Sequence, residues 1–259
     1  MLAASAALRR QNVRSAGLKP RQTQLRMLTL ERGHFACFRG AQLGPMALAV
    51  VSCRSLRAKA TASVATARVR ESGMPVVDWW EQLVNPESTL DLLGLTSGRH
   101  ATVVEFGCGY GTFTIPVAQR VQQLYSFDID QEMVSSTRQR MSQYPLVESV
   151  QLEVRDVVAN GYGLGAAVDA VLLMNILHCE APVQMLQDAA DLLKPGGLVY
   201  ATHWRYDSST PRGPPMDIRP RPEQLEEWAV QTGLLEVASG PIDCPPWHYG
   251  YTFRRKAEE

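Results

Sequence analysis

Metal-binding and disulfide-type cysteine patterns are missing from this sequence. Its cysteines are Cys37, Cys53, Cys108, Cys179 and Cys244. They form neither a CxxC pair nor a closely spaced even set, so reduced thiols are expected rather than a disulfide framework. The histidines and cysteines also lack the spacing of a zinc site, and the sequence therefore predicts no metal.

Acidic residues and long apolar runs are scarce in the first part of the chain. Residues 1–70 hold 13 Lys and Arg but one acidic residue, Glu31. Their longest apolar run, MALAVVSC at 46–53, is far too short to span a bilayer. A segment rich in Ala, Arg and Ser and poor in acids is typical of a mitochondrial or plastid transit peptide, with a disordered basic extension as the alternative. We therefore expect a soluble organellar protein whose folded domain covers 71–259.

The remaining sequence is acidic and long enough for one sizeable core. The whole chain has 26 basic and 26 acidic residues, so residues 71–259 contain 13 of the former and 25 of the latter. An acidic body is a poor electrostatic match for nucleic acid. With 259 residues, of which 45% are hydrophobic, the chain can bury one domain of catalytic size.

Strand-like and helix-like segments alternate through this domain. The expected strands are 101–106, 123–128, 149–154, 168–175, 198–204, 234–239 and 247–255, and the expected helices are 78–95 (broken near Pro86), 112–121, 131–143, 182–193 and 223–232. Strands separated by helices indicate right-handed crossovers and a parallel sheet covered on both faces. The sequence predicts a doubly wound, Rossmann-like α/β fold with a seven-stranded, mostly parallel sheet and an antiparallel strand at its C-terminal edge.

Three irregular segments interrupt this alternation. We expect loops at 160–165 and at 240–246, and a much longer, proline-rich loop at 205–222. Loops of that length inside compact domains are usually functional or mobile.

A glycine-rich loop joins the first expected strand to the first crossover helix, in VVEFGCGYGTFTIPVA at 103–118. In a doubly wound sheet, ligands bind at the carboxyl ends of the strands, where this loop lies. The dinucleotide fingerprint GxGxxG fails by one residue, because Thr112 stands where its third glycine would be. The carboxylate of Glu105 would repel a diphosphate but suit a positively charged ligand. Both features disfavour a nicotinamide-dependent oxidoreductase.

The stretch EFGCGYG at 105–111 resembles the first motif of the class I S-adenosylmethionine-dependent methyltransferases, an acidic residue, any residue and then GxGxG. The resemblance covers roughly residues 100–204 and implies S-adenosyl-L-methionine as cofactor. It implies that Asp128 binds the ribose hydroxyls, that Ile129 lies against adenine, that Asp156 approaches the adenine amino group, and that Asn175 lies near the methyl sulfonium. The implied cofactor-binding residues are Glu105, Phe106, Gly107, Gly109, Gly111, Asp128, Ile129, Asp156, Val157 and Asn175.

Two histidines follow the fourth and fifth expected strands and are candidates for catalysis. His178 could act as a general base, since imidazole titrates near neutral pH, or could simply satisfy a helix end. His203 could line the substrate pocket on the same side of the sheet. Trp79 and Trp80 could cover the site or belong to the core.

These features predict a methyltransferase that acts on a small-molecule acceptor. Relatives that modify the planar amino groups of nucleic acids or glutamine commonly carry an N/D-P-P-Y/F run after the fourth strand, and NILH at 175–178 lacks it. The alternatives are a protein methyltransferase, for which the 205–222 loop could be a docking surface, and a non-catalytic protein that binds S-adenosylmethionine.

Overall fold

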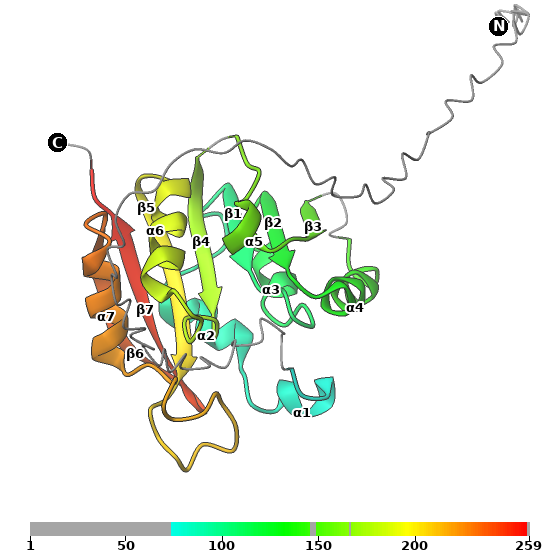
Figure 1. The fold of residues 1–259 in the computed structure, drawn as a ribbon. Helices are drawn as coiled ribbons and strands as arrows, with labels where there is room; N and C mark the ends of the chain where they lie inside the picture. Colours follow the sequence, from blue (N-terminus) through cyan, green and yellow to red (C-terminus); the bar gives the residue numbers. More distant parts are fainter. Residues whose placement is uncertain (1–73, 146–148, 166, 258–259) are drawn as a thin grey trace, which may run out of the picture. The chain divides into compact units, whose positions relative to one another are not determined.

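The structure, a computed structural model, describes residues 74–145, 149–165 and 167–257, and these contain a seven-stranded sheet (Figure 1). The strands are β1 (Thr102–Phe106), β2 (Gln123–Asp128), β3 (Val150–Val154), β4 (Val168–Met174), β5 (Leu193–Trp204), β6 (Leu235–Cys244) and β7 (His248–Arg255). Their order across the sheet is β3-β2-β1-β4-β5-β7-β6. The pairs among β1 to β5 are parallel, and β7 is antiparallel to both of its neighbours.

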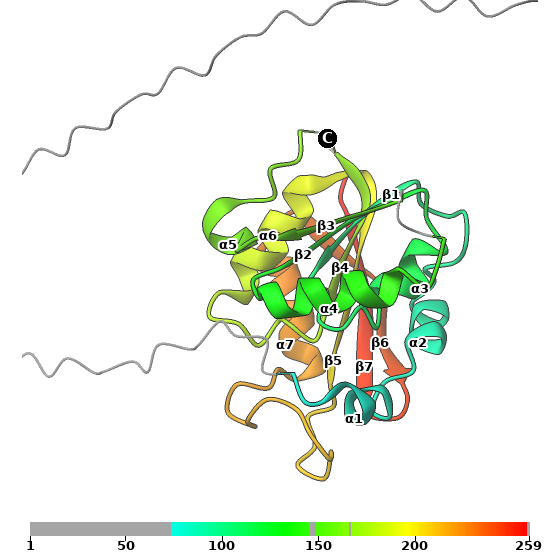
Figure 2. The same cartoon turned by 90° about the vertical axis from the view of Figure 1, so that its right-hand side faces the viewer.

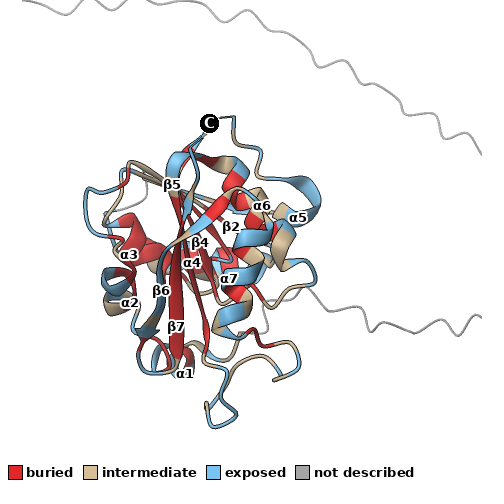
Figure 3. Cartoon of the chain, turned by 90° about the vertical axis from the view of Figure 1, so that its left-hand side faces the viewer, coloured by how far each residue is buried: buried red, intermediate tan, exposed pale blue. Residues whose placement is uncertain are grey.

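Helices cover both faces of the sheet (Figure 2). They are α1 (Val77–Glu81), α2 (Pro86–Leu93), α3 (Thr114–Ala118), α4 (Gln131–Met141), α5 (Val157–Asn160), α6 (Pro182–Leu192) and α7 (Pro222–Gln231). One hydrophobic cluster packs the helices α1, α2, α3 and α4 against one face of the sheet. A second cluster packs α6 and α7 against the other face. The central strands are buried along their length, whereas the outer faces of α5 and α7 are exposed (Figure 3).

Local sequence signals explain where the helices begin and end. The side chain of Asn85 caps α2 by accepting a hydrogen bond from the amide of Ser88, and Pro86 occupies the first turn, where it loses no helical hydrogen bond. This helix ends at Gly94, which has the left-handed conformation with φ 83°. Asp130 caps α4 in the same way.

The predicted fold class is confirmed, with differences in detail. β7 does not form the edge itself but inserts between β5 and β6, so that β6 is the edge strand. The segment 240–244, expected to be a turn, continues β6, and the turn is confined to 245–247. β5 begins earlier than expected, at Leu193, and its segment 194–197 is an irregularity where the pairing with β4 shifts.

Of two further predictions, one needs correction and the other concerns residues that the structure does not describe. The expected loop at 160–165 follows an unpredicted single turn, α5, because Asp156 accepts hydrogen bonds from the amides of Val158 and Ala159 and so caps a helix. The targeting segment 1–70 lies outside the described residues. Across the part of the chain that is described, no helix is long and apolar enough to cross a membrane.

Candidate active site

A cavity of about 530 Å³ opens at the carboxyl ends of the parallel strands. β1 lies beside β4 in the sheet, and the chain continues from these two strands toward opposite edges of the sheet. Ligands bind at such a point of reversal in doubly wound sheets. Most of the residues predicted from the sequence line this cavity: Phe106, Gly107, Gly109, Asp128, Ile129, Asp156, Val157, Asn175 and His178. Three predicted residues, Glu105, Gly111 and His203, do not.

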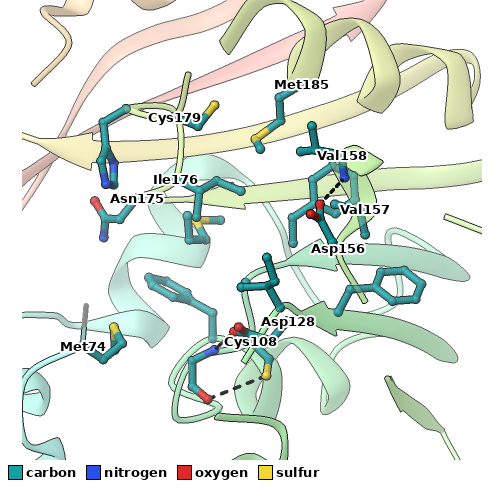
Figure 4. Close-up of a pocket in the computed structure, with 18 of the residues that line it drawn as sticks. Met74, Cys108, Asp128, Asp156, Val157, Val158, Asn175, Ile176, Cys179 and Met185 are labelled. Atoms are coloured by element: carbon teal, nitrogen blue, oxygen red, sulfur yellow. Dashed lines mark hydrogen bonds between the residues drawn. The ribbon is translucent and has the colours of Figure 1, made fainter. Parts of the chain in front are cut away.

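The cavity is elongated (Figure 4). Val157 and Val158 lie at one end, Asn175 and Met74 lie at the other, and Asp128 lies between them. The two ends therefore derive from different connections, β3–α5 at one end and β4–α6 together with the N-terminal segment at the other.

Asp128, at the end of β2, joins the glycine loop to the middle of the cavity. Its carboxylate accepts hydrogen bonds from the amides of Gly109 at 2.9 Å and Asp130 at 3.0 Å. Gly109 lines the cavity with φ +52°, a left-handed conformation that favours glycine, and without a side chain it leaves its backbone open to a ligand. Burial raises the pKa of Asp128 above its usual value, because the charged form is partly removed from water.

Apolar side chains form the end near β3. Ile129 and Val158 leave 40% and 39% of their surfaces exposed, which is unusual for large apolar residues beside a cavity. Phe106 stacks on Tyr162 with ring centroids 4.6 Å apart and closes the floor. A flat aromatic ligand group fits between such surfaces, and Asp156 supplies a carboxylate beside them.

Asn175 is the most unusual residue of the site. It has φ 60°, a left-handed conformation that residues other than glycine adopt at a free-energy cost. Its amide oxygen and nitrogen are both buried, and neither has a hydrogen-bond partner among the described residues. A buried amide that is unsatisfied and lines a cavity is a group prepared for a ligand.

Glu105 does not reach the cavity, which corrects the expectation that it contacts a ligand directly. Only 1% of it is exposed, and its carboxylate accepts hydrogen bonds from Thr114 and Ser126, each at 2.6 Å. Its side chain thus ties β1 to β2 and α3. Burial raises the pKa of Glu105 to about 7, and the charge of Asp128 contributes in the same direction.

The pH dependence of stability should report this buried acid. A carboxyl group with a raised pKa binds a proton more tightly in the folded chain, so its stabilising contribution falls as the pH rises from about 4.5 to about 7. Glu105→Gln removes this titration. When the pH is raised from 5 to 8, wild type should therefore lose roughly 2 to 3 kcal/mol of unfolding free energy that the Glu105→Gln variant does not lose.

Urea denaturation at the two pH values measures this difference, with Glu227→Gln on the exposed face of α7 as the control. Equal pH dependence of Glu105→Gln and wild type would contradict the assignment.

Gly111 also lies away from the cavity, and its role is conformational. It has φ +78°, and an added Cβ would lie 3.0 Å from the side chain of Thr137 on α4. The third glycine of the loop therefore permits a left-handed turn and close packing of α4, in place of the predicted contact with cofactor.

His178 lines the cavity, whereas His203 is fully buried behind it. The expectation that His203 lines a substrate pocket is therefore wrong, because its side chain is fully buried against His178 and Tyr249 and does not reach the cavity. The structure instead brings the two histidines together: Nδ1 of His178 is 3.2 Å from Nε2 of His203, and the rings meet edge to face.

The N-terminal segment and the long loop supply further wall residues, of which the sequence analysis had considered only Trp80. Met74, Trp80 and Ile218 all line the cavity. Trp80 is also a core residue whose indole N–H donates to Thr112 at 2.9 Å, so both of its expected roles are met. Trp79 is partly exposed beneath the guanidinium of Arg212. The length of the 205–222 loop was the only sequence signal that pointed to Ile218.

Arg219 holds that loop in shape. It is 7% exposed and donates to the backbone oxygens of residues 205, 207, 212 and 214 and to the hydroxyl of Thr210. Gly213 leaves the space that the guanidinium needs, since a Cβ there would lie 2.5 Å from it. One buried arginine thus orders the segment that brings Ile218 to the cavity, at the same end of the sheet as α1 (Figures 1 and 2).

The donor set fits the cofactor that the sequence resemblance implies. Carboxylates at the ends of β2 and β3 suit a ribose diol and an adenine amino group, and the glycine loop lets a ligand approach the backbone. The unpartnered amide of Asn175 lies where a further polar group would be met. Among the described residues, no three His, Cys, Asp or Glu side chains gather as a metal site would require.

Comparison with known proteins agrees with this assignment. Residues 103–197 match the family model described as a methyltransferase domain. No curated protein sequence matches the chain significantly.

Solved structures share the fold. A SAM dependent methyltransferase from Aquifex aeolicus has a TM-score of 0.57 and 18% identity, covering 67% of this chain and 91% of its own. The N-methyltransferase NodS from Bradyrhizobium japonicum WM9, in complex with S-adenosyl-l-homocysteine, has a TM-score of 0.54 and 18% identity, covering 72% and 95%. The cyclase SpnF has a TM-score of 0.55 and 17% identity, covering 66% and 79%. The presence of a cyclase among these structures shows that this fold carries more than one reaction.

Proposed function

This chain belongs to the class I S-adenosylmethionine-dependent methyltransferases. We therefore propose that it transfers the methyl group of S-adenosylmethionine to a small, largely apolar acceptor molecule. The observation that carries this proposal is the apolar part of the cavity wall, to which Met74, Trp80 and Ile218 contribute. Met74 lies at the same end of the cavity as Asn175, where the methyl group is expected (Figure 4). Such a wall favours an acceptor that leaves water on binding.

Charge supports the same acceptor class. Arg155 is the one arginine or lysine among the described residues of the wall, and it belongs to the β3 end, where it pairs with Glu153 at 2.7 Å and lies over the ring of Phe127. A carboxylate or phosphate on the acceptor would therefore find no cation at the other end. The excess of acidic residues over 71–259 argues against nucleic acid as the acceptor.

Different residues of the cavity are expected to bind the cofactor and to support methyl transfer. Asp128, Ile129, Asp156 and Val157 would hold the nucleoside part of S-adenosylmethionine, and the amide of Asn175 would lie beside its sulfonium end. When bound, the cofactor supplies a methyl group already activated by the positive sulfur. The protein must then align the acceptor for in-line displacement and exclude water, which the apolar wall does.

We assign His178 as the general base. Its Nε2 takes the proton from the acceptor atom as that atom forms its bond to the methyl carbon. Bound S-adenosylmethionine would supply the methyl group and leave as S-adenosylhomocysteine, with the electron pair of the sulfur–methyl bond kept by sulfur. The protonated His178 would then return its proton to water.

Calorimetry of the full chain with S-adenosylmethionine, S-adenosylhomocysteine and NAD tests the cofactor site, and methyl-tritiated S-adenosylmethionine then tests the acceptor. Incubation with a cell extract should place the label in the small-molecule fraction. Label in the protein fraction would instead identify a protein methyltransferase. Binding without any transfer would identify a non-catalytic binding protein.

We propose that residues 1–70 direct the protein to an organelle. The support is their composition alone, with 13 Lys and Arg against a single acid. Fused to a fluorescent protein, this segment should deliver the fusion to mitochondria or plastids and be shortened there. A matched fusion in which the arginines are replaced by glutamine should stay in the cytosol. Cytosolic fluorescence of the native fusion would exclude targeting.

A further inference from the structure

His178 and His203 form a hydrogen-bonded pair of imidazole rings. The two ring nitrogens lie 3.2 Å apart, and the ring centroids are separated by 5.3 Å at an interplanar angle of 78°. His178 follows β4 at the wall of the cavity, whereas His203 lies on β5 and is 0% exposed. His178 can therefore contact an acceptor in the cavity, whereas His203 can influence the acceptor only through His178.

We propose that His203 is a positioning residue, which holds His178 in the tautomer with its proton on Nδ1 so that Nε2 is the basic nitrogen toward the acceptor. This inference rests on the proposed function, in which His178 is the base. A neutral imidazole has one nitrogen that donates and one that accepts. With Nε2 of His203 as the acceptor, the Nδ1 proton of His178 has a partner both before and after His178 takes up a second proton.

The surroundings of His203 keep it neutral, so it carries one ring proton. In the proposed role that proton is on its Nδ1, which is buried and has no hydrogen-bond partner among the described residues. The titratable and charged groups that face it are His178 from the β4–α6 connection, His248 and Tyr249 from β7, and Arg219 from the segment before α7. Burial lowers the pKa of His203 well below its usual value, and the charge of Arg219 adds to the effect. His203 therefore stays neutral near pH 7, and a neutral partner can accept a hydrogen bond without competing for the proton.

The opposite arrangement makes a different and measurable prediction. If Nε2 of His203 carried the proton and donated to Nδ1 of His178, then the proton of neutral His178 would be on its Nε2. That nitrogen could not accept a proton from an acceptor. The tautomer of His178 therefore decides the proposal, and it can be measured without any knowledge of the acceptor.

Long-range proton–nitrogen NMR of the full chain saturated with S-adenosylhomocysteine reports which ring nitrogen carries the proton. In wild type, His178 should carry it on Nδ1, and His203 should not titrate between pH 5.5 and 8.5. His203→Leu removes the acceptor while keeping a similar volume, and should move the proton of His178 to Nε2. His203→Gln offers an amide oxygen in a similar place and should restore the Nδ1 tautomer.

Kinetics with an acceptor found by the labelling experiment give the second readout. His203→Leu should lower kcat by about 10- to 100-fold with little change in KM, and His203→Gln should recover most of the loss. A proton on Nε2 of His178 in wild type, or equal kcat in the leucine and glutamine variants, would overturn the proposal. If the tautomers are as stated but no methyl transfer occurs with any acceptor, the proposed function fails instead. Affinity for S-adenosylhomocysteine shows that each variant is folded.

Discussion

His178→Gln is expected to lower kcat by about 10²- to 10⁴-fold, the range that a positioned general base contributes. Glutamine fills similar space at the wall of the cavity but cannot take up a proton. The loss should therefore fall on kcat, whereas the affinity for S-adenosylmethionine should change little. The residues expected to hold its nucleoside follow β2 and β3, whereas His178 follows β4.

The pH dependence of kcat separates this effect from a change of shape. In wild type the rate should rise as His178 loses its proton, and this rising limb should disappear in His178→Gln. Steady-state kinetics from pH 5.5 to 9, with calorimetric binding of S-adenosylhomocysteine as the test of folding, measures both. Full turnover of the variant across that range would remove His178 from the mechanism.

Asp128→Ala is expected to weaken S-adenosylmethionine binding by about 1 to 3 kcal/mol, or roughly 5- to 150-fold in Kd. Two losses combine in this variant. The charge-assisted hydrogen bonds expected to the ribose disappear, and the amide of Gly109 loses the carboxylate that now holds the glycine loop in place. Asp128→Asn keeps an oxygen that can accept from one amide, so its affinity should fall between wild type and alanine.

Asp130→Asn is the matched control, since Asp130 lies two residues further along the chain and caps α4 without lining the cavity. Asparagine caps helices about as well as aspartate, so this variant should bind as wild type does. Calorimetric titration of the four proteins makes the comparison. Unchanged affinity in Asp128→Ala would refute the ribose assignment, and equal losses at both positions would point to a general effect of charge.

The sequence predicted the sheet well because the signals for its strands are local. Buried β-branched and apolar runs separated by helix-length segments leave few ways to connect a parallel sheet. The same reasoning placed Gly107, Gly109, Asp128 and Asp156 near one another, because the carboxyl ends of parallel strands share one edge. The break in the segment 78–95 was found because Pro86 marks it, and α2 begins at this residue.

Errors arose where an outcome depends on side chains distant in sequence. Position in a motif suggested that Glu105 meets the ligand, but Ser126 and Thr114 take its carboxylate into the core. α5 was missed because a single capped turn has no periodicity for a sequence pattern to reveal. Ile218 was missed because nothing local shows that Arg219 folds the proline-rich loop back toward the cavity.

By itself, the sequence determined the class of the fold, the glycine loop, and the carboxylates that follow β2 and β3, because periodicity, turn chemistry and strand order are properties of neighbouring residues. The tertiary structure alone decided which of these groups face the cavity, that Asn175 keeps an unpartnered amide there, and that His203 lies behind His178. Burial and hydrogen-bond partners are set by contacts across the sheet, between residues as far apart as 25 positions in this pair of histidines, and no local pattern encodes them.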